Sequence, residues 1–278
     1  TCAHVTRVLT EQGRAAGVAY RKHGRDIRLQ ARGGVILSAG ALQTPQLLML
    51  SGIGPAEHLA QFGIAPVADR RQVGLNLQDH LQIRLIYRCA KPITTNDQLR
   101  SLYGRMRIGL EWLLWRTGPL AIGINQGGLF TRVLPESERP DIQFHIATLS
   151  ADMAGGKPHD FPGFTLSVCQ LRPESRGRVS LASPDPFAPP RIESNYLATN
   201  TDRRCAAEAV AFARKLAETT PLSSYVTEEI LPGPDARTHE DFLAFARANG
   251  ATIFHPSGTC RMGSDEDAVV NPRLRLRG

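Results

Sequence analysis

The chain has 278 residues, 42% of them apolar, which is enough for a large hydrophobic core in one or two globular domains. Its 33 basic and 26 acidic residues give a net charge of +7, but the basic residues, mostly Arg, are scattered with no block of five or more. Nucleic-acid binding needs such charge gathered on one face beside stacking aromatic rings. With aromatic residues at only 6%, we predict no nucleic-acid partner.

Neither a transmembrane helix nor a signal peptide is predicted. No run of about 18 apolar residues occurs, and the N-terminal TCAHVTRVLT lacks the basic, apolar and small-residue zones of a leader. The five Cys lie far apart without a CxxC pair, which favours reduced thiols over a disulfide framework. We therefore expect a cytoplasmic protein without a membrane span, and peripheral membrane association stays open.

The first third of the chain predicts a small sheet followed by a buried strand. Residues 4–10, 14–22 and 26–31 are rich in β-formers and separated by Gly-containing turns, as in an antiparallel meander. The run GGVILSAG at 33–40 is continuously apolar before a small-residue turn, which is typical of a buried parallel strand.

Two short helices are expected next. Thr44 can cap a helix and Pro45 suits its first position, so QLLMLSG is predicted to continue the helix to Gly52. A second helix is expected over PAEHLAQFG, residues 55–63.

The pattern changes after residue 80 to strands mixed with longer helices. This order indicates a mainly antiparallel sheet with helices on one face. The predicted strands are 81–89, 141–149, 164–173, 177–183 and 191–197, and the predicted helices are 105–118, 201–220 and 238–250.

One segment resembles a nucleotide-binding motif but does not meet its requirements. SGIGPAE at 51–57 begins like a GxGxxG fingerprint, but Glu57 stands where the last Gly belongs. LLMLS before it is helical, whereas the fingerprint needs a strand that ends at the first Gly. We interpret this segment as a turn between two helices.

The stretch HPSGTCRMG at 255–263 concentrates reactive side chains. Cys260 lacks a base fixed beside it by the sequence, so a packing role is favoured over a nucleophilic one. His255 and Cys260 alone are too few ligands for a metal, and we predict no metal site. His255 follows apolar residues and precedes a Pro-Ser-Gly turn, so it is either a general base near neutral pH or a satisfied core histidine.

Two further histidines are ambiguous. His145 lies within a predicted strand, where a structural role is favoured over one facing a polar cavity. Asp79 beside His80 either orients that imidazole or closes a turn, and the sequence favours neither role over the other.

Four motifs in order carry a resemblance to a known family. They are GALQTPQLLMLSGIG (40–54), GLNLQDH (74–80), LRPESRGRVSL (171–181) and HPSGTCRMG (255–263). In this order and spacing the sequence resembles the flavin-dependent glucose-methanol-choline (GMC) oxidoreductases, and among them the choline dehydrogenase-like alcohol dehydrogenases. The resemblance runs essentially from end to end.

The resemblance implies an α/β (α+β) fold with a discontinuous FAD-binding domain. Residues 1–80 then form part of a Rossmann-like FAD-binding domain, 81–235 a substrate domain with an antiparallel sheet, and 236–278 a return to the first domain. The family also has an N-terminal GxGxxG segment and a C-terminal catalytic segment that this sequence lacks. We therefore expect a fragment of a longer enzyme, which need not hold FAD or turn over by itself.

Carried over by position, the resemblance assigns roles to five residues. His255 corresponds to the histidine that accepts the alcohol proton while hydride moves to flavin N5. Val5 matches the position whose backbone meets the adenine, and Ser38, Ala39 and Gly40 match the turn near the ADP moiety, where small residues permit close approach. No chemistry is assigned to NLQDH.

The resulting hypothesis is FAD-dependent oxidation of a small-molecule alcohol to an aldehyde or ketone. The electron acceptor stays open between oxygen, a quinone and another carrier. A choline site would need an aromatic cage or a carboxylate, for which Trp112, Trp115, Phe144 and Glu111 are candidates. The alternatives are a non-catalytic remnant that binds no flavin and acts as an interaction module, and a non-redox member of the same fold of the hydroxynitrile lyase kind.

Overall fold

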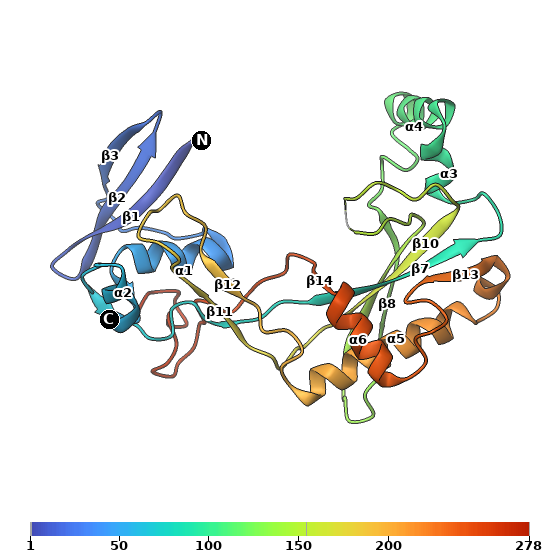
Figure 1. Ribbon diagram of the computed structural model, residues 1–278. Coiled ribbons are helices and arrows are strands. Elements are labelled where there is room, and N and C mark those ends of the chain that lie inside the picture. The colour runs from blue at the N-terminus through green and yellow to red at the C-terminus, as the bar shows by residue number, and fades with distance from the viewer. Residues whose placement is uncertain (1, 154, 278) are drawn as a thin grey trace. The chain divides into compact units, whose positions relative to one another are not determined.

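The computed structural model describes residues 2–153 and 155–277, which divide into two compact units. Unit 1 comprises residues 1–79, 175–196 and 254–278, and unit 2 comprises 80–174 and 197–253. The chain therefore passes from one unit to the other at four points. Figure 1 shows the elements of each.

Two segments belong to other units than the boundaries from sequence imply. Residues 175–196 join unit 1 because β11 (Gly177–Ser180) pairs with β6 (Leu75–Leu77) on one edge and with β12 (Arg191–Glu193) on the other. Residues 236–253 join unit 2 because α6 (His239–Asn249) packs into the core there. The β6–β11 pairing joins segments about a hundred residues apart, and periodicity does not detect such partners.

The predicted N-terminal meander is confirmed. Strands β1 (Ala3–Glu11), β2 (Arg14–Lys22) and β3 (Arg25–Gln30) form an antiparallel sheet in that order. Two-residue turns with positive φ at both positions join them, Gln12-Gly13 and His23-Gly24. This is the type I′ geometry that matches the twist of paired strands.

The buried parallel strand predicted over 33–40 is wrong. Residues 34–38 have no assigned secondary structure, and Ile36 is 92% exposed. A parallel strand needs hydrogen-bonded neighbours and cover on both faces. Among the described residues no strand pairs with this run, so its apolar character alone does not make it one.

The two short helices of unit 1 are present, but the first begins earlier than predicted. Helix α1 spans Gly40–Leu50, with Pro45 inside it, and α2 spans Ala56–Gln61 after Pro55. Residues 45–50 of α1 are all buried. Because α1 begins at Gly40, Thr44 lies inside the helix and is not its cap. Two short parallel strands, β4 (Ile53–Gly54) and β5 (Ala68–Asp69), complete this part.

The main sheet of unit 2 is antiparallel throughout, as predicted. Its order is β13-β7-β10-β9-β8, with β14 also paired to β7. The strands are β13 (Val226–Leu231), β7 (Leu81–Cys89), β10 (Gly163–Gln170), β9 (Ile142–Ala147), β8 (Asn125–Thr131) and β14 (Ala251–Thr252). Strands β8 and β13 were not predicted: β8 is mostly exposed and Gly-rich, and β13 carries adjacent glutamates.

Helix α5 (Asn200–Ala217) covers β10 and β7, and α6 lies beside it (Figure 1). Small residues on the inner face of α5 bring it close to the sheet, where Phe144, Leu166 and Val168 are fully buried. At the edge of this core the Arg214 guanidinium holds the Glu229 carboxylate. The predicted layer of helices on a sheet face is confirmed.

A further helical region projects from unit 2. Helix α3 (Thr95–Arg100) was not predicted, and α4 (Leu102–Trp115) begins one turn before the predicted position and ends at Arg116, which adopts a left-handed conformation. A short 3₁₀ turn, η1 (Leu222–Tyr225), follows α5. Across 2–153 and 155–277, none of the helices has the length and apolarity needed to cross a membrane.

Leu166 and Leu110 provide a matched test of this core. Leu166 is completely buried on β10, so Leu166→Ala should lower the free energy of unfolding by about 2–5 kcal/mol because a cavity remains. Leu110 is 53% exposed on α4, and Leu110→Ala should change it by no more than about 0.5 kcal/mol. Urea denaturation of both variants measures the difference, and equal effects would contradict the described core.

Candidate active site

The loop that carries His255 is bonded along the segment 74–79 of unit 1. Gln78 and Ser257 exchange two backbone hydrogen bonds, with N···O distances of 2.9 and 2.8 Å. The Gly74 amide donates to the Thr259 carbonyl at 2.9 Å. The His255 loop therefore runs antiparallel to the GLNLQDH motif, and its backbone is fixed by long-range pairing.

Asp79 fixes the loop at His255 itself. One carboxylate oxygen accepts a hydrogen bond from the His255 amide at 3.0 Å, and the other accepts one from the Tyr196 hydroxyl at 2.5 Å. Asp79, Tyr196 and His255 lie at or next to the ends of the three segments that make up unit 1. One carboxylate thus joins three distant parts of the sequence.

A glycine is required directly after Ser257, the residue that pairs with Gln78. Asn76 Nδ2 donates to the Gly258 carbonyl at 3.1 Å, and Gly258 has a φ of +90°. A Cβ at this position would lie 2.3 Å from the Asn76 carbonyl oxygen and 2.8 Å from its Nδ2. Both the conformation and the close approach exclude a side chain.

Thr259 connects the loop to α1 through a carbonyl that a proline leaves free. Pro45 has no N–H, so the Ala41 carbonyl one turn earlier lacks its usual helical donor. The Thr259 hydroxyl donates to that carbonyl at 2.6 Å, and Thr259 is only 1% exposed. The proline inside α1 therefore creates the attachment point of the His255 loop.

The backbone next to His255 is strained. Phe254 has a φ of +62°, which is rare for a large side chain and costs about 1–3 kcal/mol. Phe254 is 78% exposed, and His255 is also exposed. His255 is therefore not the buried, hydrogen-bonded core histidine that was the alternative from the sequence. The imidazole lies at the surface of unit 1, on a backbone held in an unusual conformation.

Cys260 has the environment of a packing residue. It contacts the apolar cluster of unit 1, and burial raises the pKa of its thiol to about 11. The thiol is neutral at physiological pH and is a poor nucleophile. Arg261 does not counteract this, since its guanidinium is paired with both oxygens of Asp265 at 2.8 and 2.5 Å.

The residues predicted to contact FAD lie in the same unit as His255. Ser38, Ala39 and Gly40 form the exposed turn that enters α1, and Gly40 has a φ of +80° with no atom within 4 Å of where its Cβ would stand. Val5 is on β1, paired with Tyr20 and 38% exposed.

The start of α1 suits an anionic group such as a pyrophosphate. No side chain caps the helix and its first turn holds no acidic residue, so its N–H groups and positive dipole end are available. The exposed small residues before it allow close approach of a ligand to the backbone. The Thr259 hydrogen bond to Ala41 connects this turn with the His255 loop.

The other candidate residues from the sequence make contacts that are typical of a structural role. The His80 Nε2 lies 3.1 Å from the Leu171 carbonyl, and the His145 Nδ1 lies 3.3 Å from Gln82 Nε2. Phe144 is fully buried in the core of unit 2, whereas Trp115 is 66% exposed on α4. These two rings cannot belong to one cage for a cationic substrate.

Sequence reasoning assigned no role in positioning this loop to Asn76, Asp79 or Tyr196, and it related Asp79 only to His80 or to a turn. The first two lie in the NLQDH motif, which the family resemblance singled out without a role. Tyr196 carried no signal, because its hydroxyl meets Asp79 only through the pairing of β11 and β12 in unit 1.

Comparison with known proteins gives one consistent family. Models described as GMC oxidoreductase match residues 1–82 and 173–278, the first an N-terminal and the second a C-terminal family model. An alcohol dehydrogenase [acceptor] of Pseudomonas putida is 39% identical over 100% of this chain and 51% of its own length. An oxygen-dependent choline dehydrogenase of Staphylococcus saprophyticus is 37% identical over 98% and 49%.

Solved structures agree with this result. A formate oxidase of Aspergillus oryzae, studied for FAD modification, matches with a TM-score of 0.91 and 26% identity over 99% of this chain and 53% of its own. A pyridoxine 4-oxidase from Mesorbium loti matches with a TM-score of 0.82 and 27% identity over 99% and 50%. The chain spans about half the length of the curated relatives it matches.

Substitution of two glycines with positive φ distinguishes the cost of backbone strain from the cost of crowding in the His255 loop. Gly13→Ala, in an open turn, should cost about 1–2 kcal/mol of unfolding free energy from strain alone. Gly258→Ala should cost roughly 1–3 kcal/mol more, because its Cβ would meet Asn76. Chemical denaturation compares them, and equal losses would show that the loop does not approach Asn76 as described.

Proposed function

Since this chain belongs to the GMC oxidoreductase family, we propose that it takes part in the FAD-dependent oxidation of an alcohol to an aldehyde or ketone, with His255 as the proton acceptor. The observation that carries this proposal is an exposed imidazole on a backbone held by Asp79, in the same unit as an uncapped helix start. The relatives' names, alcohol dehydrogenase and choline dehydrogenase, support the reaction class.

His255 contributes a base that an alcohol requires. A hydroxyl group is too weak an acid to ionise freely near neutral pH, so a positioned imidazole that takes its proton contributes about 10²- to 10⁴-fold. The imidazolium so formed then stabilises the developing alkoxide. Exposure of His255 leaves room for a substrate hydroxyl beside the ring.

Ser38, Ala39, Gly40 and the first turn of α1 would hold part of the FAD, and Val5 would contribute its backbone at the adenine. When bound, FAD supplies the acceptor for the hydride of the carbinol carbon. The protein's own residues supply orientation: the Thr259 bond to Ala41 keeps the base and the predicted phosphate turn on one scaffold.

Asp79 is a positioning residue in this proposal. It touches the His255 backbone and the Tyr196 hydroxyl, and it therefore acts through the location of the imidazole. The strained Phe254 peptide next to it would relax to an ordinary conformation if this hydrogen bond were lost.

The proposed partners are a small-molecule alcohol and an electron acceptor. The relatives' names refer both to an unspecified acceptor and to oxygen, so the acceptor class belongs to the same proposal. All five Cys are present as thiols rather than in disulfides, which supports the proposed cytoplasmic location.

Replacing His255 tests the base directly. In the flavin-loaded protein, His255→Ala should slow reduction of the flavin by an alcohol under anaerobic conditions by about 10²- to 10⁴-fold, because no group accepts the hydroxyl proton. Stopped-flow absorbance in the flavin bands measures the rate. His239→Ala is the matched control, since His239 is an exposed histidine on α6 paired with Glu208.

Three results would contradict the proposal. Unchanged reduction in His255→Ala would remove the histidine from the reaction. Bound flavin that no alcohol reduces would favour a non-redox member of the fold. Full-length protein containing this chain that stays colourless after FAD is supplied would favour an interaction module.

Two substitutions of Asp79 test whether it positions His255 or only stabilises the fold. Asp79→Ala should lower the rate of flavin reduction by about 10²-fold through displacement of the imidazole. Asp79→Asn keeps an oxygen that accepts from the His255 amide, so it should recover most of the rate. Flavin content and melting temperature are recorded in parallel. A rate loss that only follows flavin loss would contradict a positioning role.

A further inference from the structure

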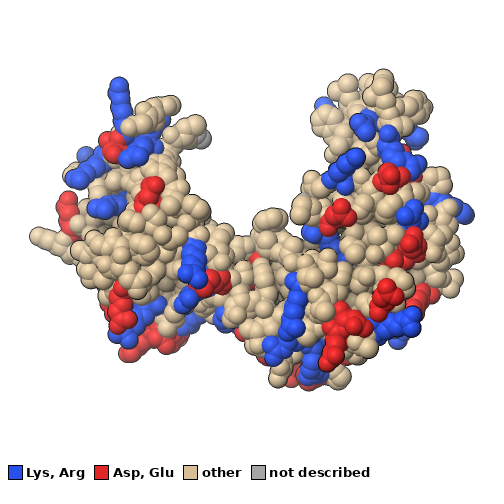
Figure 2. All heavy atoms as spheres, in the orientation of Figure 1, with Lys and Arg blue, Asp and Glu red and all other residues tan. Residues whose placement is uncertain are grey.

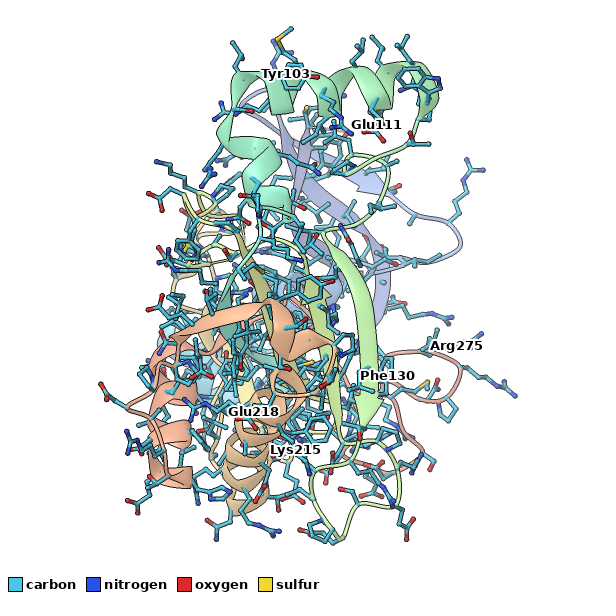
Figure 3. The ribbon with its side chains drawn as sticks, turned by 90° about the vertical axis from the view of Figure 1, so that its right-hand side faces the viewer. Tyr103, Glu111, Phe130, Lys215, Glu218 and Arg275 are labelled. Carbon is cyan, nitrogen blue, oxygen red and sulfur yellow. The ribbon has the colours of Figure 1, made fainter. Side chains whose placement is uncertain are left out.

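Helix α4 carries its apolar face away from the core of unit 2. Seven of its large side chains are more than half exposed, six of them on one side of the helix, whereas Ile108 is only 5% exposed. The six are Leu102, Tyr103, Met106, Leu110, Leu113 and Leu114. Figure 3 shows Tyr103 and Glu111 along this helix, and Figure 2 shows mainly uncharged atoms at its outer side.

The helical period shows that this exposure is one continuous stripe. At about 100° per residue the six side chains fall within an arc of about 120°, and Ile108 lies about 180° from the middle of that arc. A helix on the surface of a soluble domain normally buries such a stripe against the core. Here the stripe points outward and Ile108 attaches the helix to unit 2.

Basic side chains border the stripe. Arg105 and Arg107 are exposed and fall on its two sides, and Arg116 lies over the Trp112 ring with 4.1 Å between guanidinium carbon and ring centroid. The one acidic residue of α4, Glu111, lies about 120° from the middle of the stripe, as far as Arg105 does. It accepts a hydrogen bond from Thr117 at 3.4 Å. The border is therefore net positive.

The loop after α4 adds further exposed apolar area through Leu120, Ile122 and Ile124, each more than half exposed. Trp115 is also 66% exposed, but it lies about 160° from the middle of the stripe, on the same side of the helix as Ile108. Tyr103 in the stripe, with arginines beside it, matches the boundary between lipid headgroups and acyl chains. The length of the helix, 14 residues, suits a position in the plane of that boundary.

We propose that α4 and the loop after it dock onto an anionic membrane surface, with the stripe in the acyl boundary and the arginines at the headgroups. Charge complementarity favours this occupant, because Arg105, Arg107 and Arg116 would meet negative phosphates while the stripe leaves water. The proposal does not rest on the oxidation chemistry.

Both tryptophans of the chain, Trp112 and Trp115, are on α4, so their fluorescence reports the surroundings of this helix. The full chain is titrated with vesicles of phosphatidylcholine, or of an equimolar mixture with phosphatidylglycerol. We expect a blue shift and co-sedimentation with the anionic vesicles, both weakened by added salt.

Two double variants measure the apolar and the electrostatic contributions to vesicle binding separately. Leu110→Asp with Leu113→Asp should abolish the shift. Arg105→Gln with Arg107→Gln should weaken partitioning roughly 30-fold, since each lost charge contributes about a factor of five to ten. Leu29→Asp and Arg28→Gln, at exposed positions on β3, are the matched controls and should leave binding unchanged. Circular dichroism confirms folding of each variant.

Four outcomes would overturn the proposal. They are no blue shift with either vesicle, equal binding to neutral and anionic vesicles, and loss of binding in the β3 controls. The fourth is a dimer in size-exclusion chromatography with light scattering that Leu110→Asp with Leu113→Asp dissociates, since the stripe would then be covered by a second copy.

Discussion

The carboxylate of Asp79 accepts a hydrogen bond from the His255 amide and another from the Tyr196 hydroxyl, and the location of the imidazole depends on this pair of contacts. Each of the three residues lies at or beside the end of a separate segment of unit 1. Since a carboxylate offers two acceptor oxygens in one plane, it can join two donors that secondary structure alone would not bring together.

Further hydrogen bonds hold the rest of the His255 loop against the segment 74–79 and against α1. Gly258 allows the backbone to approach Asn76, and Thr259 uses the carbonyl that Pro45 leaves without a helical donor. The loop is therefore bonded both to the segment before unit 2 and to α1. For this reason the turn at Ser38–Gly40 and the histidine share one rigid support, although more than two hundred residues separate them in the sequence.

Two exposed apolar regions of the chain differ in their chemistry. Ile36 lies in GGVILSAG, a segment without charged residues that lacks any strand partner among the described residues. Helix α4 instead combines its stripe with arginines on both sides. The first has the composition of a buried strand, whereas the second is amphipathic by itself, and only the second identifies the surface that would cover it.

The sequence by itself determined the local elements and the family. Period-two patterns and Gly turns defined the meander, helical periodicity defined α5 and α6, and four ordered motifs identified the GMC oxidoreductases and pointed to His255. Tertiary structure decided the unit to which 175–196 belongs, the loss of the strand at 33–40, and the roles of Asp79 and Tyr196. Those depend on hydrogen bonds between residues far apart in the chain, and local periodicity carries no information about such partners.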